Sequence, residues 1–343
     1  MADITVRGAG IFGLSIAWVC ACRGARIQVI DPAGPAAGSS GGLVGALAPH
    51  VPENWNPKKA FQFESLLAAA AFWQEVEATG GQSSGYVRTG RLQPVADITA
   101  LPLAQRRADQ SRDLWQNKAV WNVEKASASP WAPVSASGWM IRDSLSALLH
   151  PKQACAALVA ALASKGVTIA ADGPEKGAVI WATGVDGLCA LNATHHRQVG
   201  NGIKGQAALL QHDARGQPQI FADGLHIIPH GDGTVGVGST SEREFTDART
   251  TDAQLDAVIE RARAAVPALA DAAVIDRWAG VRPRARSRAP MLGAWPGRPG
   301  HFIANGGFKI GFGMAPKVAE VMADLALEGS AQVPPGFDVA ASF

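Results

Sequence analysis

The chain has 343 residues, more than one small hydrophobic core usually serves, so its length predicts two domains. Apolar residues make up 47% of the sequence and charged residues 17%, a balance typical of a compact soluble protein and not of a disordered one. The formal net charge of +2 is too small to indicate, by itself, a nucleic acid or an anionic membrane as the partner.

The N-terminal segment has the pattern of a strand, a glycine-rich turn, a helix and a second strand. The strands are predicted over residues 3–7 and 26–30, and an apolar helix over residues 14–22. Gly8, Gly10 and Gly13 give the spacing G-x-G-x-x-G between the first strand and the helix, and Asp31 follows the second strand. In this complete βαβ context, the motif predicts a Rossmann-like α/β domain that binds a dinucleotide.

Each part of the motif has a physical role in such a site. Gly8 permits the tight turn, Gly10 lets the backbone approach a pyrophosphate, and Gly13 lets the helix pack close to the sheet. The helix N-terminus offers unpaired N–H groups and the positive end of its dipole to the phosphates. Asp31 can accept hydrogen bonds from both ribose hydroxyls. The alternative is a glycine-rich turn that binds no ligand.

A loop of small residues, 32–42, follows Asp31 and contains many turn formers. Its small residues allow close approach of a ligand to the backbone, and the hydroxyls of Ser39 and Ser40 can donate to phosphate. We therefore favour a ligand-binding loop, with a flexible linker as the alternative.

The remaining periodicity alternates between helix and strand signals. Helices are predicted over residues 58–79, 103–117, 151–165, 251–265 and 315–327. Strands are predicted over residues 87–95, 138–142, 167–170, 178–184, 203–211, 225–229, 235–238, 274–281 and 301–305, and a loop over residues 127–137. Strand–helix patterns at the start, middle and end predict one α/β domain built from separated segments, with a β-rich second domain between them.

The 4 cysteines show neither metal-ligand spacing nor a disulfide framework, so reduced thiols and no metal site are expected. The N-terminus enters a strand without a secretory signal, and no apolar run is long enough to span a bilayer. We therefore expect a cytoplasmic protein without a membrane span.

Several further segments carry a family resemblance when they are taken with the N-terminal motif and its loop. In order and spacing, the sequence resembles the D-amino-acid oxidase superfamily of FAD-dependent oxidoreductases, most closely its glycine oxidase and sarcosine oxidase branch. The segments are residues 182–184 (ATG), 203–206 (IKGQ), 227–229 (IIP), 278–283 (WAGVRP) and the glycine-rich turn 306–313 before the last helix.

The resemblance implies an α/β fold with a discontinuous Rossmann-like FAD-binding domain over residues 1–60, 140–200 and 285–343. Residues 61–139 and 201–284 would form an α+β substrate domain, whose mainly antiparallel sheet covers the flavin. It implies FAD, and we expect non-covalent binding because no histidine or cysteine matches the covalent attachment found in some relatives.

The turn 306–311 can aim N–H groups and a helix N-terminus at the negative charge that builds near flavin N1 and O2 on reduction. The predicted cofactor-binding residues are therefore Gly8, Gly10, Ile11, Phe12, Gly13, Asp31, Ser39, Ser40, Gly41, Gly42, Thr183, Gly184, Gly306, Gly307, Phe308, Lys309, Ile310 and Gly311.

Arg282 is the first candidate for substrate binding, because it resembles the arginine that grips the substrate carboxylate in the family. A guanidinium fork matches a carboxylate with two parallel hydrogen bonds, and Pro283 favours an extended Arg282 at a strand end. The alternative is one solvated basic run, which we prefer for Arg284, Arg286 and Arg288.

Lys309 and His226 are the other candidate catalytic residues. Lys309 stands in a Gly-Phe-Lys sequence that is similar to the carboxylate-binding lysine of sarcosine oxidase; a hydrated surface lysine is the alternative. His226 replaces a substrate-facing tyrosine of glycine oxidase and can hydrogen-bond a carboxylate or merely pack.

The resemblance implies oxidation of the CH–NH bond of a small amino acid or N-substituted amino acid, by hydride transfer to flavin N5. The partners would be a small carboxylate-bearing amine and O2 or another electron acceptor. Two alternatives stay open. The first is a tRNA-modifying enzyme that acts on carboxymethylaminomethyl-uridine, because the loop 38–49 also resembles that enzyme's FAD domain and the basic run 282–288 offers an RNA footprint. The second is a non-catalytic flavin-binding protein.

Overall fold

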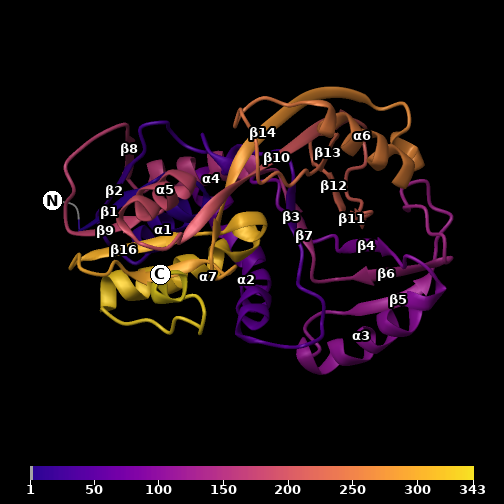
Figure 1. The fold of residues 1–343 in the computed structure, drawn as a ribbon, viewed down its shortest axis with the longest axis horizontal. Coiled ribbons are helices and arrows are strands. Elements are labelled where there is room, and N and C mark those ends of the chain that lie inside the picture. The colour runs from indigo at the N-terminus through magenta and orange to yellow at the C-terminus, as the bar shows by residue number, and fades with distance from the viewer. Residues whose placement is uncertain (1–2) are drawn as a thin grey trace.

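The structure is a computed structural model and describes residues 3–343. Two large sheets lie next to each other, and helices surround the six-stranded one (Figure 1). The chain crosses between the two sheets several times, so segments far apart in sequence share each sheet.

The first sheet has six strands in the order β15–β16–β9–β1–β2–β8. Five of them are parallel, and β15 pairs antiparallel with β16 at one edge. The strands are β1 (Ile4–Arg7), β2 (Ile27–Ile30), β8 (Thr168–Ala170), β9 (Ala178–Trp181), β15 (Met291–Ala294) and β16 (His301–Asn305).

Helices cover both faces of this sheet, as a mostly parallel sheet requires. On one side α1 (Ile11–Cys22), α2 (Pro57–Gly80), α4 (Pro151–Ser164) and α7 (Gly311–Glu328) pack on one another and share the largest hydrophobic core. On the other side α5 (Gly184–Thr194) buries Leu188 and Leu191 against Ile303 and Met291.

The second sheet has eight strands in the order β14–β10–β13–β12–β11–β4–β6–β5. All its pairs are antiparallel except β11 with β4. The strands are β4 (Arg91–Pro94), β5 (Trp121–Lys125), β6 (Trp139–Asp143), β10 (Gly200–Gln211), β11 (Gln219–Ala222), β12 (Leu225–Pro229), β13 (Thr234–Gly238) and β14 (Ala273–Ala285); β3 (Gly45–Leu47) and β7 (Ala147–Leu149) form a separate pair.

The two faces of the eight-stranded sheet differ because side chains alternate along each strand. Ala208, Leu210, Val235 and Val237 share a core with the apolar side of α6 (Ala253–Ala265). The opposite face carries Gly205, Ala207, Gly238 and His226 among its paired positions and is turned toward the six-stranded sheet. The remaining helix, α3 (Leu101–Leu114), packs beside β5.

The predicted α/β architecture is confirmed, and most predicted elements are present, with shifted ends. Three predictions are wrong in extent: α1 begins at Ile11, α7 begins at Gly311, and β14 runs on through Pro283 to Ala285. Glycines in the first turns of α1 and α7 lower the helix propensity there, so the predicted helices began too late. Proline is tolerated in β14 because this strand lies at the sheet edge. Helix α5 and strands β3, β5, β7, β11 and β15 were not predicted.

The division into two domains at the predicted boundaries remains a prediction. Helix α2, which spans the first predicted boundary at residue 60, packs on α4 and α7.

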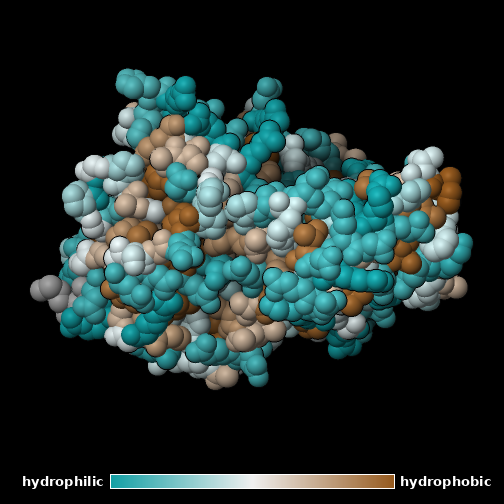
Figure 2. Space-filling model, turned by 90° about the horizontal axis from the view of Figure 1, so that it is seen from below, coloured by the Kyte–Doolittle hydropathy of each residue, from teal (hydrophilic) through white to brown (hydrophobic). Residues whose placement is uncertain are grey.

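The helices, the surface and the cysteines bear on the predicted location of the protein. Among residues 3–343, no helix combines the length and apolar character needed to cross a bilayer. Seen from below, hydrophilic side chains cover most of the face, with hydrophobic residues in scattered patches (Figure 2). All four cysteines are free; Cys20 and Cys155 are buried, whereas Cys22 and Cys189 are exposed.

Candidate active site

The predicted cofactor residues converge at one edge of the six-stranded sheet. Strands β1, β2, β9 and β16 are parallel, so their carboxyl ends meet there. These ends lead into Gly8, Asp31, Thr183 and Gly306 respectively. Ligands of open α/β sheets bind at this edge, and the position therefore agrees with a dinucleotide site.

The first glycine-rich turn leaves no room for side chains at two positions. Gly8 has φ +103°, and a Cβ there would lie 2.4 Å from the Ala182 carbonyl oxygen. A Cβ at Gly13 would lie 1.8 Å from the carbonyl oxygen of Gly8. Glycine is thus required for the turn and for the packing of α1 against it, as the motif predicts.

Asp31 and Ser40 are held at the same turn. The N–H groups of Ala9 and Ala33 donate to the Asp31 carboxylate at 2.7 and 3.0 Å, which fixes the carboxylate beside the turn. The Ile11 N–H donates to Ser40 Oγ at 3.0 Å, and a Cβ at Gly10 would lie 3.1 Å from that oxygen. Because Ser40 Oγ accepts here, its own proton is left for a phosphate oxygen at the N-terminus of α1.

The second glycine-rich turn contacts the first. A Cβ at Gly307 would lie 2.8 Å from Phe12 Cζ, and one at Gly311 would lie 3.6 Å from Ile11 Cγ2. The N-termini of α1 and α7 therefore point to one region, with the short 3-10 helix Phe308–Ile310 leading into α7. Two helix dipoles at one place favour a ligand with negative charge at two positions.

The other predicted cofactor residues border this region. A Cβ at Gly41 would lie 2.4 Å from the Ala36 carbonyl oxygen, and one at Gly42 would lie 3.5 Å from Trp278 of β14. Ser39, Ser40 and Gly41 form a single 3-10 turn, and Thr183 precedes the first residue of α5, Gly184. The Asn305 side chain donates to the Gly184 carbonyl oxygen at 2.8 Å, which ties the ends of β9 and β16 together. These cradles fit an extended dinucleotide.

The eight-stranded sheet closes over the region through its glycine-rich face. A Cβ at Gly236 would lie 2.2 Å from the Leu43 carbonyl oxygen, and one at Gly238 would lie 3.1 Å from Val44 Cγ2. The loop after residue 42 therefore lies directly on β13. A cleft of about 350 Å³ borders the outer side of the loop 35–41, between Trp278 and α4.

Arg282 projects from β14 onto this same face. Its guanidinium occupies the space above Gly205, where a Cβ would lie 1.7 Å from Nη2. Nη1 donates to Ser239 Oγ at 2.8 Å, and Nη2 donates to the carbonyl oxygens of Thr240 and Lys204 at 2.6 and 3.3 Å. Among residues 3–343, Nε has no hydrogen-bond partner. Burial lowers the pKa of Arg282 to about 10, so it is charged at neutral pH.

Lys309 and Arg284 join Arg282 around a single aromatic ring. The charged groups of Arg282, Arg284 and Lys309 lie 5.8, 5.6 and 5.9 Å from the centroid of the Phe308 ring. Lys309 is the exposed member, and its pKa is lowered by desolvation within the surrounding protein and by the charge of Arg282.

The prediction that Arg284 belongs to a solvated run is wrong, because its side chain is half-buried beside Phe308. Arg286 and Arg288 are exposed, as predicted, and Arg286 Nε donates to the Ser342 carbonyl oxygen at 3.1 Å.

His226 lies on β12, on the same face, where its backbone pairs with Gly238. The imidazole packs against Phe221 with the ring centroids 4.8 Å apart, and its Nδ1 has no partner within residues 3–343. Burial, together with the positive charges of Arg91 and Lys309, lowers the pKa of His226 to about 3. His226 is therefore neutral at pH 7 and within electrostatic reach of Lys309.

Comparisons with known proteins agree with this geometry. The sequence model of the family described as FAD dependent oxidoreductase matches residues 3–325. The chain belongs to this family of FAD-dependent oxidoreductases. FAD is accordingly its cofactor, and the cradles at Gly8, Gly13 and Gly307 fit it.

Individual relatives match nearly the whole chain. An uncharacterized oxidoreductase of Bacillus subtilis, YurR, is 25% identical over 95% of both chains. Glycine oxidase of Geobacillus kaustophilus is 23% identical over 94% of this chain and 92% of its own. The crystal structure of that glycine oxidase superposes with a TM-score of 0.85, at 20% identity, over 98% of both chains.

The FAD-dependent oxidoreductase also contains a charged network that the sequence did not predict as such. Lys204 Nζ lies 3.6 Å from Glu242 Oε2, and both side chains are buried. Gln206 donates to Glu242 at 3.1 Å, and Thr240 Oγ1 donates to it as well. The backbone carbonyl oxygen of Thr240 also accepts from Arg282, so Thr240 joins the network to the arginine. The sequence analysis pointed to this network only through residues 203–206, which are one of the segments of the family resemblance.

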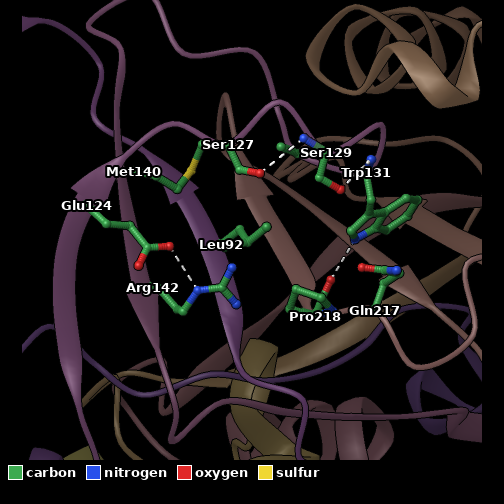
Figure 3. Close-up of a pocket in the computed structure, with 10 residues that line it drawn as sticks. Leu92, Glu124, Ser127, Ser129, Trp131, Met140, Arg142, Gln217 and Pro218 are labelled. Carbon is green, nitrogen blue, oxygen red and sulfur yellow. Dashed lines mark hydrogen bonds and ion pairs between the residues drawn. The ribbon is translucent and has the colours of Figure 1, made fainter.

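A second cavity of the oxidoreductase lies away from the cofactor edge. It measures about 110 Å³ and is lined by β4, β5, β6 and the segment around Trp131 (Figure 3). Its charged groups, Glu124 and Arg142, pair with each other at 2.9 Å, and Trp131 Nε1 donates to the Pro218 carbonyl oxygen. Its two charged side chains therefore pair with each other, and the cavity contains none of the predicted site residues.

Proposed function

We propose that this oxidoreductase oxidises the CH–NH bond of a small amino acid or N-substituted amino acid, in the cytoplasm, with O2 or another molecule as the final electron acceptor. The observation that carries the proposal is the pair of cations, Arg282 and Lys309, which meet beside the second glycine-rich turn without a carboxylate partner among residues 3–343. Such a pair is suited to the carboxylate of the substrate.

The two cations have different parts in binding. Arg282 is anchored by Ser239, Thr240 and Lys204, so its charge has a fixed position. Lys309 is exposed and has no carboxylate within ion-pair distance among residues 3–343, so its three donors are free to contact the substrate. We infer that Lys309 contacts the carboxylate directly, while Arg282 supplies fixed charge and its unpartnered Nε. A carboxylate held on a fixed side of the pocket orients the adjacent Cα–H bond.

The same cations act on the amine. An excess of positive charge in a partly desolvated pocket disfavours a substrate ammonium and lowers its pKa, so the amine loses its proton on binding. Bound FAD supplies the two-electron acceptor for the Cα–H bond. His226, neutral at pH 7, adds no further charge and can exchange one hydrogen bond with the substrate. The chain therefore contributes orientation and electrostatics and needs no dedicated base.

An anaerobic screen tests the proposal. The purified holoenzyme is mixed with amino acids and N-methylated amino acids, and bleaching of the flavin spectrum is followed. We expect at least one amine to reduce the flavin, and Lys309→Met and Arg282→Ala to raise its apparent dissociation constant at least tenfold while FAD remains bound. Lys125→Met, which removes an exposed lysine stacked on Trp139 at 4.0 Å, is the matched control. Absence of reduction by every amine would refute the function, and unchanged binding in both site variants would refute the assigned residues.

A further inference from the structure

Positive charge extends from the carboxylate pocket outward to the N-terminal end of α2. Lys58 lies in the first turn of this helix, and its Nζ donates to the carbonyl oxygen of Arg288. Lys58 thus adjoins Arg288, and desolvation together with the positive charges of Arg288 and Arg284 lowers the pKa of Lys58. Arg284 is shared between this outer group and the ring of Phe308. We call Lys58, Arg284 and Arg288 the basic rim.

The basic rim and the inner pair lack compensating acids. Within residues 3–343, none of Lys58, Arg282, Arg284, Arg288 and Lys309 takes part in an ion pair, although most other lysine and arginine clusters on the molecule do. Among residues 3–343, Glu242 is the one acid whose charge acts on Arg282, and Glu242 is already paired with Lys204. A substrate with a single carboxylate would neutralise the inner pair only in part and would leave the rim unmatched.

The spacing suits two anionic groups on one small molecule. Arg284 and Lys309 both lie within 6 Å of the Phe308 ring centroid, so their charges are at most about two such distances apart. A chain of a few carbon or nitrogen atoms between two carboxylates covers that range. Arg284 presents a planar fork that can take the second carboxylate with two parallel hydrogen bonds.

We propose that the substrate is a dicarboxylic amine: an amino acid with a second carboxylate on its side chain or on its N-substituent, held by Arg284 and Lys58 of the basic rim. Arg284 is then a specificity-determining residue. This inference rests on the proposed function for the fate of the amine, but the recognition of two carboxylates can be measured without turnover.

The test measures binding of unreactive carboxylates to the FAD-loaded enzyme by isothermal titration calorimetry. Succinate, glutarate and adipate are compared with butyrate, pentanoate and hexanoate at 50 and 300 mM salt. We expect one dicarboxylate to bind at least tenfold more tightly than its monocarboxylate partner, with a smaller difference at high salt. Arg284→Ala should abolish the difference and Arg284→Lys should retain part of it. Arg277→Ala is the matched control, since Arg277 lies on β14 but pairs with Asp256 of α6 at 2.6 Å on the opposite face.

The outcomes separate this proposal from the function it extends. Equal affinity for mono- and dicarboxylates, or a difference that survives Arg284→Ala, overturns the dicarboxylate proposal even if amines reduce the flavin. A dicarboxylate preference that depends on Arg284 supports it even if no tested amine is oxidised. Tight, salt-sensitive binding of tRNA together with no dicarboxylate preference would assign the rim to a polynucleotide and would likewise overturn it.

Discussion

The position of Arg282 depends on the absence of a side chain at Gly205, which makes Gly205→Ala a sharp test of the site. The new Cβ would lie 1.7 Å from Nη2, 2.3 Å from Cζ and 2.9 Å from Nε. Because ordinary contacts are about 3.5–4 Å, the guanidinium must move by roughly 2 Å. It would then leave Thr240 and Ser239, whose oxygens accept from it at 2.6 and 2.8 Å.

The expected magnitude follows from charge-assisted hydrogen bonding. Such bonds contribute about 1.5–3 kcal/mol, so loss of the ordered guanidinium should weaken carboxylate binding roughly 10–150-fold. FAD content should be unchanged, because the three atoms nearest to a Cβ at Gly205 all belong to the Arg282 side chain. The assay is titration of the holoenzyme with a carboxylate ligand, followed by the flavin spectrum. Gly231→Ala is the control, since a Cβ there meets nothing within 4 Å. Binding as tight as in the wild type would refute the view that Gly205 makes the place for Arg282.

Three further predictions concern the cofactor and the fold. Gly13→Ala puts a Cβ 1.8 Å from the carbonyl oxygen of Gly8, so we expect a folded protein that purifies with little FAD absorbance; full flavin content would contradict the turn geometry. Asp143→Asn leaves the buried Arg91, its partner at 2.9 Å, without a counter-charge. We expect it to lower the free energy of unfolding, measured in urea, by about 3–5 kcal/mol.

Acid should destabilise the fold through the adjacent rings of His150 and His230, whose centroids lie 4.5 Å apart. Burial lowers the pKa of His230 to about 3 and lowers that of His150 too. Below pH 6.5, these two histidines therefore bind protons in the unfolded chain while they stay neutral in the folded protein. The free energy of unfolding should fall as the pH drops below about 6.5, by up to about 1.4 kcal/mol per pH unit for each ring. An equal free energy at pH 7 and 5 would exclude buried neutral rings, and His230→Gln should reduce the slope.

The dinucleotide cradle could be predicted because its signals are local. Gly8, Gly13 and Asp31 lie within one βαβ unit, and their roles depend on a turn and a strand end that the adjacent residues define. The position of Ser40 could also be predicted, since the loop after Asp31 must pass close to that turn. The structure brings all four residues to one turn, and their roles toward the cofactor stay predictions.

The substrate side could be predicted only in part, because its geometry comes from strand pairing across the chain. The cation at Arg284 looked like one of a solvated run, and only the extension of β14 through Pro283 places it beside Phe308. Glu242 carries no signal for a site, and Gly205 carries only that of the segment 203–206 in the family resemblance. Their importance arises from the register that sets Gly205 opposite Gly280 and from the bridge between Lys204 and Glu242.

Arg282 and Lys309, the two cations proposed to bind the carboxylate, belong to different parts of the fold. Arg282 is fixed to the eight-stranded sheet through β14, whereas Lys309 belongs to the turn between β16 and α7 of the six-stranded part. Under the proposed function, a bound carboxylate would link the two parts, and its affinity would depend on how closely they are held together. Leu43 and Val44 contact the glycines of β13 where the two parts meet. The glycines of this face leave room for Leu43 and Val44 of the other part. On the same face of the sheet, Arg282 meets Lys309 at the ring of Phe308.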